Sequence, residues 1–456
     1  MFSKILVANR GEIAHRVIRA CRELEIKTVA VYSEADETSL HLTLADERVC
    51  IGPPISAKSY LNIGNILNAA KETGADAIHP GYGYLAESEE FARACEDSGM
   101  VFIGPTPKNL QLAGDKITAK SIMKEAGIPV IPSSSGGVSD VEEAVGLSKE
   151  IGYPVMVKAS GGGGGRGIRI CEDEDMLLEE FPVAKMEARV SFGKDELYIE
   201  KFIVDPRHIE FQILADSSGK VVHLGERECT IQRRFQKLIE ESPSPALSVE
   251  MRETMGNAAM DAARAVNYFN AGTVEFLVDQ NNNFYFMEIN ARIQVEHPVT
   301  ELTTGIDLVK EQIRLASGEN LEYCFEDLNK RGWAIECRIN AEDPDRNFAP
   351  SPGTIEEYHP PGGFGVRLDT HIYQGYELPI YYDSLIAKLI SYDLTRDGAV
   401  RIMKRALEEF KIQPVKTTIP LYLKVMDDPQ FRAGDFNTDF ISRFLPDEDD
   451  EDDDEY

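Results

Sequence analysis

The sequence predicts an α/β protein of several domains, and three stretches support this prediction. Residues 4–33 run strand, helix, strand, which is the pattern of a βαβ unit in a parallel sheet. Residues 155–170 place five consecutive glycines, then Arg166 and Gly167, between two strand-like runs. Residues 273–290 form two runs rich in β-branched and aromatic residues around Gln-Asn-Asn-Asn, which indicates a β-hairpin. The length of 456 residues suits about two to four domains.

The composition is that of a soluble globular protein. The chain is 43% hydrophobic and 28% charged, and no apolar run approaches the ~20 residues that span a bilayer. The N-terminus lacks the pattern of a signal peptide, so we expect a cytoplasmic protein that binds no membrane. The net charge of −30 argues against nonspecific nucleic-acid binding. The seven cysteines show no CxxC spacing, so reduced thiols are expected rather than a zinc site or a disulfide framework.

The N-terminal region is predicted to form one α/β domain. Its first turn, Asn-Arg-Gly-Glu, is not GxGxxG, so the fingerprint of a dinucleotide site is absent. A later strand near residues 76–79 leads into Gly-Tyr-Gly. Because loops at the carboxyl ends of parallel strands bind ligands in open α/β sheets, this loop is a candidate binding element.

Two lysines are candidate phosphate ligands. Lys116 lies in the first turn of a helix that begins near Asp115, where a cation opposes the helix dipole. An ordinary surface lysine is the alternative interpretation. Lys158 alternates with Val155 and Val157 on a predicted strand, and a lysine in an apolar strand needs an anion nearby.

The glycine run after Lys158 is predicted to be a flap over a nucleotide. Gly162, Gly164 and Gly167 fit GxGxxG, but a strand rather than a helix follows, and GxxxxGK[ST] is absent. A glycine-rich hairpin whose N–H groups close over phosphates fits this context. A flexible linker is the alternative, which the flanking strands disfavour.

Residues 207–237 add polar groups to strand-like runs. His208, Glu210 and Gln212 share one strand face, although a single histidine on a strand is more often structural than a ligand. Basic side chains gather in the following segment, namely Arg227, Arg233, Arg234 and Lys237. They suggest anion binding, with salt bridges to the protein's own glutamates as the alternative.

The hairpin of residues 273–290 is predicted to hold a cation. With the turn centred on Asn281 and Asn282, Glu275 faces Glu288, and Asn290 lies on the same face as Glu288. Two opposed carboxylates share a proton or bind a cation, and with an amide oxygen they suit Mg²⁺. The alternative is an exposed polar strand face.

Six motifs together resemble the biotin carboxylase family, the ATP-grasp subunits of biotin-dependent carboxylases. They are KILVANRGEIA, HPGYGYLAES, KASGGGGGRG, ERECTIQRRFQK, FMEINARIQVEHPVTE and AIECRINAEDP, and they extend to about residue 443. The resemblance implies three domains. These are a Rossmann-like pre-ATP-grasp domain (1–112), an ATP-grasp domain (113–330) whose mobile glycine-rich lid spans about 131–203, and a C-terminal mixed α/β domain (331–445). The acidic composition of residues 446–456, apart from the resemblance, predicts a disordered tail.

The resemblance also implies roles for single residues. Those for ATP are Lys116, Lys158, Gly164, Gly165, Glu200, Lys201, Ile203, His208, Gln232, Glu275, Leu277 and Glu288. Those for Mg²⁺ or Mn²⁺ are Glu275, Glu288 and Asn290. Those for bicarbonate are Lys237, Arg292, Gln294, the backbone of Val295, and the general base Glu296, while Tyr82 and Arg338 are assigned to biotin. Lys237, Arg292, Glu296 and Arg338 form the implied catalytic group.

The implied reaction is the carboxylation of biotin at N1′ with ATP and bicarbonate, through carboxyphosphate. Glu296 would deprotonate bicarbonate, and Arg338 would stabilise the enolate-like oxygen of biotin. Biotin is expected on a separate carrier protein, because the chain lacks Ala-Met-Lys-Met, and a carboxyltransferase is expected as a further partner. A homodimer is expected from the family.

Other functions stay open at the level of sequence. One is a different ATP-grasp ligase, such as half of a carbamoyl-phosphate synthetase or a purine-pathway carboxylase. Another is a non-catalytic nucleotide-binding protein, against which the joint presence of Lys237, Glu296 and Arg338 argues. The final acceptor, whether acetyl-CoA, propionyl-CoA or pyruvate, is not indicated. The chain departs from the family at Phe235, where histidine is common, and at Ala291, where threonine is common.

Overall fold

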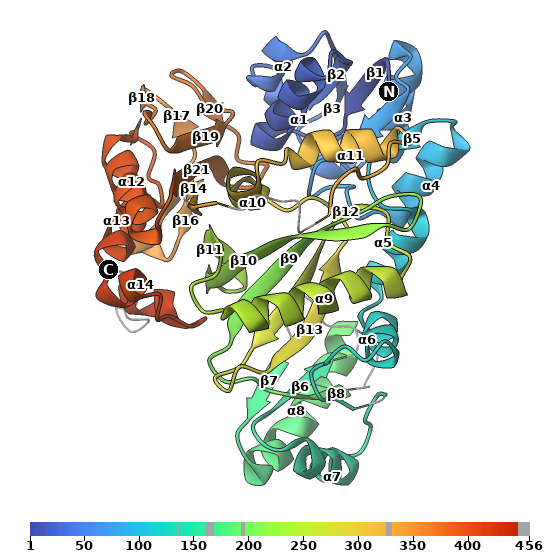
Figure 1. Ribbon diagram of the computed structural model, residues 1–456, viewed down its shortest axis with the longest axis vertical. Coiled ribbons are helices and arrows are strands. Elements are labelled where there is room, and N and C mark those ends of the chain that lie inside the picture. Colours follow the sequence, from blue (N-terminus) through green and yellow to red (C-terminus); the bar gives the residue numbers. More distant parts are fainter. Residues whose placement is uncertain (135, 160–167, 193–196, 325–330, 446–456) are drawn as a thin grey trace.

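The computed structural model describes residues 1–134, 136–159, 168–192, 197–324 and 331–445 (Figure 1). The molecule is elongated, with the N-terminal region at one end and the segment around α7 and α8 at the other. A large twisted sheet lies between them, and the C-terminal helices lie beside this sheet. The site residues discussed below come from the N-terminal region, the large sheet and the segment that carries α7 and α8.

The N-terminal region contains a five-stranded parallel sheet in the order β3-β2-β1-β4-β5. Its elements are β1 (Lys4–Val7), α1 (Gly11–Glu23), β2 (Lys27–Ser33), α2 (His41–Leu44), β3 (Glu47–Gly52), α3 (Ile63–Thr73), β4 (Ala77–His79), α4 (Glu89–Asp97), β5 (Val101–Phe102) and α5 (Pro107–Gly114). The predicted βαβ unit is confirmed, since β1 and β2 are parallel and α1 buries Ile13, Val17 and Ile18. Hydrophobic periodicity does not reveal β3, because its first residues are charged and exposed.

The next region contains a small antiparallel sheet in the order β7-β6-β8, covered by helices. Its elements are α6 (Lys116–Glu125), α7 (Val141–Ile151), β6 (Val155–Ala159), β7 (Ile168–Cys171), α8 (Glu174–Phe192) and β8 (Leu197–Lys201). As predicted, Asp115 caps α6 by accepting a hydrogen bond from the Thr118 N–H at 3.0 Å. The strands β6 and β7 pair with each other on either side of the glycine run. Gly162, Gly164, Gly165 and Gly167 themselves lie outside the described residues.

The central sheet has eight antiparallel strands in the order β13-β12-β9-β10-β11-β14-β21-β19. They are β9 (Arg207–Ala215), β10 (Val221–Arg233), β11 (Gln236–Ser242), β12 (Asn270–Val278), β13 (Phe284–Asn290), β14 (Trp333–Asn340), β19 (Val366–Thr370) and β21 (Leu385–Asp393). The helices nearby in sequence are α9 (Val249–Ala265), α10 (His297–Thr304) and α11 (Leu308–Ala316). The sheet therefore joins strands from both sides of residue 331.

The described C-terminal residues also form short strands and three α-helices. They are β15 (Glu342–Asp343), β16 (Ala349–Pro350), β17 (Gly353–Thr354), β18 (Glu357–His359), β20 (Glu377–Leu378), α12 (Arg396–Glu409), β22 (Lys411–Gln413), α13 (Ile419–Asp427) and α14 (Pro429–Ala433). The helix α12 packs on one face of β14 and β21, where Ile335, Cys337 and Leu389 are buried. The opposite face of these strands carries Arg338 and Lys388 and packs against α10 and α1.

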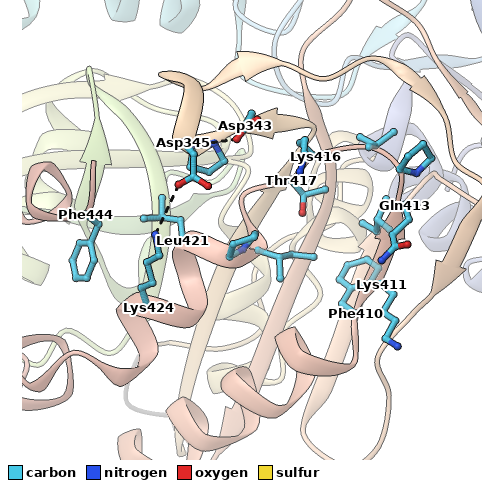
Figure 2. A pocket seen from close by; sticks show the side chains of 16 residues that line it. Asp343, Asp345, Phe410, Lys411, Gln413, Lys416, Thr417, Leu421, Lys424 and Phe444 are labelled. Carbon is cyan, nitrogen blue, oxygen red and sulfur yellow. Dashed lines mark hydrogen bonds and ion pairs between the residues drawn. The ribbon is translucent and has the colours of Figure 1, made fainter. Parts of the chain in front are cut away.

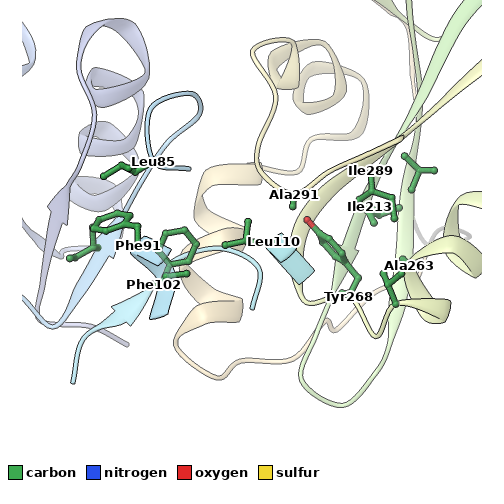
Figure 3. Close-up of a cluster of buried hydrophobic side chains, with 14 of the residues drawn as sticks. Leu85, Phe91, Phe102, Leu110, Ile213, Ala263, Tyr268, Ile289 and Ala291 are labelled. Carbon is green, nitrogen blue, oxygen red and sulfur yellow. The ribbon is translucent and has the colours of Figure 1, made fainter. Parts of the chain in front are cut away.

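A shared hydrophobic cluster fixes the N-terminal region to the central sheet (Figure 3). Phe91 and Phe102 meet edge to face, with ring centroids 5.9 Å apart. The same cluster continues to Tyr268 and Ile289 beside the β12–β13 hairpin. All seven cysteines are free thiols, as expected. Among the residues that the structure describes, no helix is long and apolar enough to cross a membrane.

Candidate active site

The predicted glutamate pair lies in the hairpin formed by β12 and β13. Glu275 faces Glu288, as predicted, and Thr273 faces Asn290. A β-bulge interrupts the pairing between the Glu275–Glu288 pair and the pair formed by Phe276 and its partner on β13. The two carboxylates therefore share one face of the sheet, as a cation site requires.

The predicted turn of this hairpin is wrong by one position. The prediction centres it on Asn281–Asn282, but Val278 pairs with Phe284, so the loop is longer than a two-residue turn. The side chain of Asp279 accepts backbone hydrogen bonds within this loop. Met287 is the extra residue of the bulge, and it restores the register beyond it. The one-residue shift at the turn and the one-residue insertion at Met287 cancel each other. The predicted Glu275–Glu288 pair is therefore correct although the predicted turn is not.

The bulge also assigns the side chains of β13 to their faces. Phe286 faces Phe276 on the buried side, whereas Glu288, two residues later, faces Glu275 on the polar side. In a regular strand, residues two apart share a face. The extra Met287 thus places aromatic side chains in the core and the acidic side chain in the site.

Lys237, on β11, lies at the centre of a buried ion cluster. Its ammonium donates to Glu210 Oε2 at 2.5 Å, to Glu275 Oε1 at 2.9 Å and to Glu296 Oε1 at 2.6 Å. The three N–H donors of the ammonium thus bind three carboxylates. Burying these carboxylates without a cation would cost free energy. Although burial lowers the pKa of Lys237, the surrounding anionic groups raise it well above its ordinary value. The lysine therefore stays charged.

Glu296 connects this cluster to Arg338. Its second oxygen accepts from the Arg338 Nη2–H at 3.0 Å, while Arg338 Nε–H donates to Glu240 at 2.6 Å. Burial raises the pKa of Glu296, but Lys237 and Arg338 outweigh burial and hold the pKa well below its usual range. The predicted base is therefore ionised at neutral pH and fully enclosed.

The segment between β13 and α10 brings the other predicted bicarbonate residues to the same place. Arg292 donates to Asn290 Oδ1 at 3.2 Å and to Gln294 Oε1 at 3.3 Å. Gln294 in turn donates to Glu275 Oε1 at 3.1 Å, and the Val295 carbonyl accepts from Lys388 at 2.8 Å. The structure thus joins Arg292, Gln294 and Glu275 in one network with Lys237.

The predicted phosphate lysines are paired with carboxylates. Lys116 lies 2.6 Å from Glu288, and Lys158 donates to Glu200. Lys120 also donates to Glu200, whose pKa is lowered because the two lysines outweigh burial. Lys120 is absent from the predicted site, although its position one helical turn after Lys116 could have indicated it.

The other predicted nucleotide residues surround this region. The Lys201 ammonium donates hydrogen bonds to the backbone carbonyl oxygens of residues 152 and 153. Its side chain thereby holds the loop before β6. His208 Nε2 bonds to Glu275 Oε2 at 3.0 Å, and its strand partner on β12 is Leu277. Ile203 is buried, and Gln232 pairs with Lys237 across β10 and β11.

On the predicted biotin side, Tyr82 donates its hydroxyl to Glu12. Glu240 and Glu336 are paired across β11 and β14, next to Arg338. Burial raises the pKa of Glu240 to about 7 and that of Glu336 well above its ordinary value, since Arg338 and Lys388 only partly oppose it. Neither oxygen of Glu336 has a hydrogen-bond partner among the described residues.

Sequence reasoning misses four buried residues of this side, namely Glu12, Glu240, Glu336 as a site residue, and Lys388. The lysine could have been found by the signal that draws attention to Lys158, a single cation in an apolar strand. The carboxylates could not, because their proximity depends on which strands are neighbours.

The predicted metal ligands Glu275, Glu288 and Asn290 fit a hard cation by their oxygen chemistry. Lys237 already pairs with Glu275, to which His208 also hydrogen-bonds, and Lys116 pairs with Glu288. Both carboxylates therefore lie where positive charge is favoured. A metal ion at Glu288 would require Lys116 to turn away from that carboxylate.

Arg227 and Phe235, both noted in the sequence, lie in opposite environments. Arg227 is fully buried and bonds to Glu210, so for this residue the salt-bridge interpretation is confirmed. Phe235 lies at the tip of the β10–β11 hairpin, is 77% exposed and has φ 65°. Its ring therefore points into solvent rather than into the cluster around Lys237.

A separate cavity of about 430 Å³ lies in the C-terminal region (Figure 2). It is lined by Lys411, Lys416 and Lys424 together with Asp343 and Asp345. None of the predicted site residues lines it.

The fold and this site define an ATP-dependent ligase, and comparison with protein families identifies which one. Three family models match consecutive parts of the chain. They are "Biotin carboxylase, N-terminal domain" (residues 1–110), "Carbamoyl-phosphate synthase L chain, ATP binding domain" (residues 115–324) and "Biotin carboxylase C-terminal domain" (residues 336–443). The chain therefore belongs to the biotin carboxylase family, as its motifs predicted.

Individual relatives agree with this assignment. The chain is 57% identical to "Biotin carboxylase 1" of Bacillus subtilis, over 97% of the chain and 99% of the relative. It is 55% identical to a pyruvate carboxylase subunit of Methanothermobacter thermautotrophicus, over 97% and 90%. The biotin carboxylase domain dimer of Hydrogenobacter thermophilus 2-oxoglutarate carboxylase, solved with MgADP, ADP and bicarbonate, matches with a TM-score of 0.90 at 54% identity, covering 98% of this chain and 100% of that one.

Proposed function

We propose that this chain carboxylates biotin at N1′ on a carrier protein, with ATP and bicarbonate as co-substrates. The observation that carries the proposal is the position of Glu296, whose two oxygens bridge Lys237 and Arg338. One buried carboxylate thereby connects the residues assigned to bicarbonate with the arginine assigned to biotin. The relatives support the same activity, since they include named biotin carboxylases and a structure with MgADP and bicarbonate.

Glu296 is suited to accept the proton of bicarbonate because it is ionised. Its low pKa makes it a weak base while both cations bind it. An anionic substrate that takes over the contacts of Lys237 and Arg338 would raise the pKa of Glu296. Substrate binding and activation of the base are thus one event.

The chemistry then follows from the charges of the site. A bicarbonate oxygen attacks the γ-phosphorus while the bond to the β–γ bridging oxygen breaks, which releases ADP and forms carboxyphosphate. Bound Mg²⁺, held by Glu275, Glu288 and Asn290, would neutralise phosphate charge. Carboxyphosphate yields CO₂ and phosphate, the phosphate takes the N1′ proton, and N1′ attacks CO₂. Arg338 provides the planar cation for the negative oxygen of biotin.

The proposed partners are a biotin carrier protein and a carboxyltransferase. The relatives at 55–57% identity carry the names of biotin, pyruvate and 2-oxoglutarate carboxylases, so the acceptor is best assigned to the transferase partner.

A homodimer is proposed from the dimeric relative. Phe364, 90% exposed, is a candidate contact, and Phe364→Ala should shift the sedimentation of a dimer toward monomer.

The function is tested by ADP release in steady state. Hydrolysis of ATP should require bicarbonate and should increase on addition of free biotin, with carboxybiotin as product. Hydrolysis that ignores biotin at every concentration would contradict the proposal and favour another ATP-grasp ligase.

A further inference from the structure

A fully buried lysine, Lys388 on β21, joins two parts of the site that lie far apart in sequence. Its ammonium donates to the carbonyl oxygen of Val295 at 2.8 Å, and this residue directly precedes Glu296. The same ammonium lies 3.2 Å from Glu12 Oε1, in the first turn of α1. Lys388 therefore contacts both the bicarbonate segment and the N-terminal region.

Glu12 extends this connection to the residue assigned to biotin. Tyr82 donates its hydroxyl to the same Glu12 oxygen, and the Lys388 ammonium lies 5.8 Å from the centroid of the Tyr82 ring. Asn9 holds the backbone of the same tyrosine, donating to its carbonyl oxygen at 2.8 Å. The position of the Tyr82 ring thus depends on Glu12, whose buried charge is balanced by Lys388.

The register of the sheet explains why a lysine occupies this position. Arg338 and Lys388 are direct partners across β14 and β21, so both side chains lie on the face that packs against α10 and α1. Arg338 contacts the carboxylate of Glu296, and Lys388 contacts the carbonyl just before it. A neutral side chain at Lys388 would leave the Val295 carbonyl and Glu12 without this donor.

We propose that Lys388 is a positioning residue that couples the two halves of the reaction, an inference that rests on the function proposed above. Through Val295 it fixes the peptide that leads into Glu296, and through Glu12 it fixes Tyr82. The bicarbonate side and the biotin side thereby keep one common geometry. Lys388 acts through these groups and touches neither substrate.

The test is Lys388→Met, which keeps the length of the side chain and removes its charge. Biotin-independent ATP hydrolysis should persist with a KM for bicarbonate raised about tenfold, and stimulation by free biotin should fall about 10–100-fold, because small misplacements of reacting groups cost factors of this size. The KM for ATP should not change, since none of the contacts of Lys388 is with Lys116, Lys158 or Glu200.

A second variant separates the two contacts and protects the test against misfolding. Adding Glu12→Gln to Lys388→Met removes the unpaired buried carboxylate, and the new amide oxygen can still accept from Tyr82. Biotin stimulation should then recover in part, while the KM for bicarbonate stays high. If recovery is equal for both quantities, or absent for both, Lys388 does not act through two separate contacts and the proposal fails.

Leu389→Ala is the matched control, because Leu389 is buried on the opposite face of β21, in the core under α12. It should lower the melting temperature without changing the KM for bicarbonate or the response to biotin. The same kinetic pattern in both variants would assign Lys388 a merely structural role. A wild-type enzyme that biotin stimulates, together with an unaltered Lys388→Met variant, would overturn this inference alone. A wild-type enzyme without stimulation would overturn the proposed function as well.

Discussion

The nucleotide side and the bicarbonate side of the site differ in burial, although the Glu275–Glu288 pair of the β12–β13 hairpin contributes to both. Glu288 is 23% exposed and pairs with Lys116, which is 70% exposed. Glu275, directly opposite Glu288, is 5% exposed and bonds to His208, Gln294 and Lys237. The two glutamates are neighbours, yet Glu288 belongs to a solvent-exposed ion pair and Glu275 belongs to a buried ion cluster.

This contrast explains how the site can be both rigid and accessible. An exposed ion pair such as Lys116–Glu288 is worth only about 0–1 kcal/mol, so it opens easily for an incoming nucleotide. A buried cluster such as that around Lys237 is fixed before substrate arrives, which is how charge stabilisation acts without reorganisation. Variants on the two sides should therefore behave differently.

The largest effect is expected for Glu296→Gln on the bicarbonate side. Loss of the general base should lower kcat by about 10²–10⁴-fold. ATP affinity should stay close to wild type, because the contacts of Glu296 are with Lys237, Arg338 and Cys229. Stopped-flow measurement of single turnovers and equilibrium binding of a nucleotide analogue would check both. Undiminished turnover would show that the base is assigned to the wrong residue.

Lys237→Met should be the most destabilising change in this comparison. It leaves Glu210, Glu275 and Glu296 without their common cation, and removing one member of a buried ion pair costs about 3–5 kcal/mol of unfolding free energy. Urea denaturation would measure the loss. The matched control is Lys116→Met, for which a loss below about 1 kcal/mol is expected. Equal losses would remove the distinction between the two sides.

Lys116→Met should instead change nucleotide binding. A hydrogen bond from a charged group to phosphate is worth about 1.5–3 kcal/mol, which corresponds to a KM for ATP raised about 10–100-fold. The KM for bicarbonate should remain unchanged. Initial rates with each substrate varied separately would test this, and a change in both KM values would argue against independent sides.

The smallest effect concerns the pH dependence of stability. The folded-state pKa values of Glu240, about 7, and of Glu336 lie above the values of the unfolded chain. Their contribution is therefore fully present below the unfolded pKa and is lost as the pH rises through the folded values. Between pH 5 and pH 8 these two glutamates should act against the buried histidines, whose lowered pKa values make stability rise with pH over part of this range. Compared with wild type, Glu336→Gln should therefore raise the melting temperature at pH 8 relative to that at pH 5. The exposed control Glu408→Gln should leave the profile as in wild type; an unchanged profile for Glu336→Gln would refute the explanation.

The sequence predicts faces and motifs well because these are local properties. Strand alternation correctly places His208 with Glu210 on one face of β9. The apolar strand around Lys158 correctly indicates a lysine that needs an anion, since it pairs with Glu200.

The partners of these residues could not be predicted, because they depend on the order of strands in the sheet. Glu240 lies opposite Glu336 only because β11 and β14 are neighbours, and Lys388 meets Val295 only because the chain at α10 packs against β21. No periodicity within one strand specifies its neighbours. The bulge at Met287 escapes prediction for a related reason, since an inserted residue interrupts the alternation on which the prediction relies.

The bulge has a consequence for protein design. On β13, Phe284 and Phe286 contribute to the core and Glu288 and Asn290 to the acidic site, and one inserted residue, Met287, lies between the two pairs. Introducing a pair of carboxylate ligands into an apolar hairpin therefore does not require a new pattern for the whole strand. A single insertion, placed between the core segment and the ligand segment, is sufficient to turn the ligands toward the opposite face.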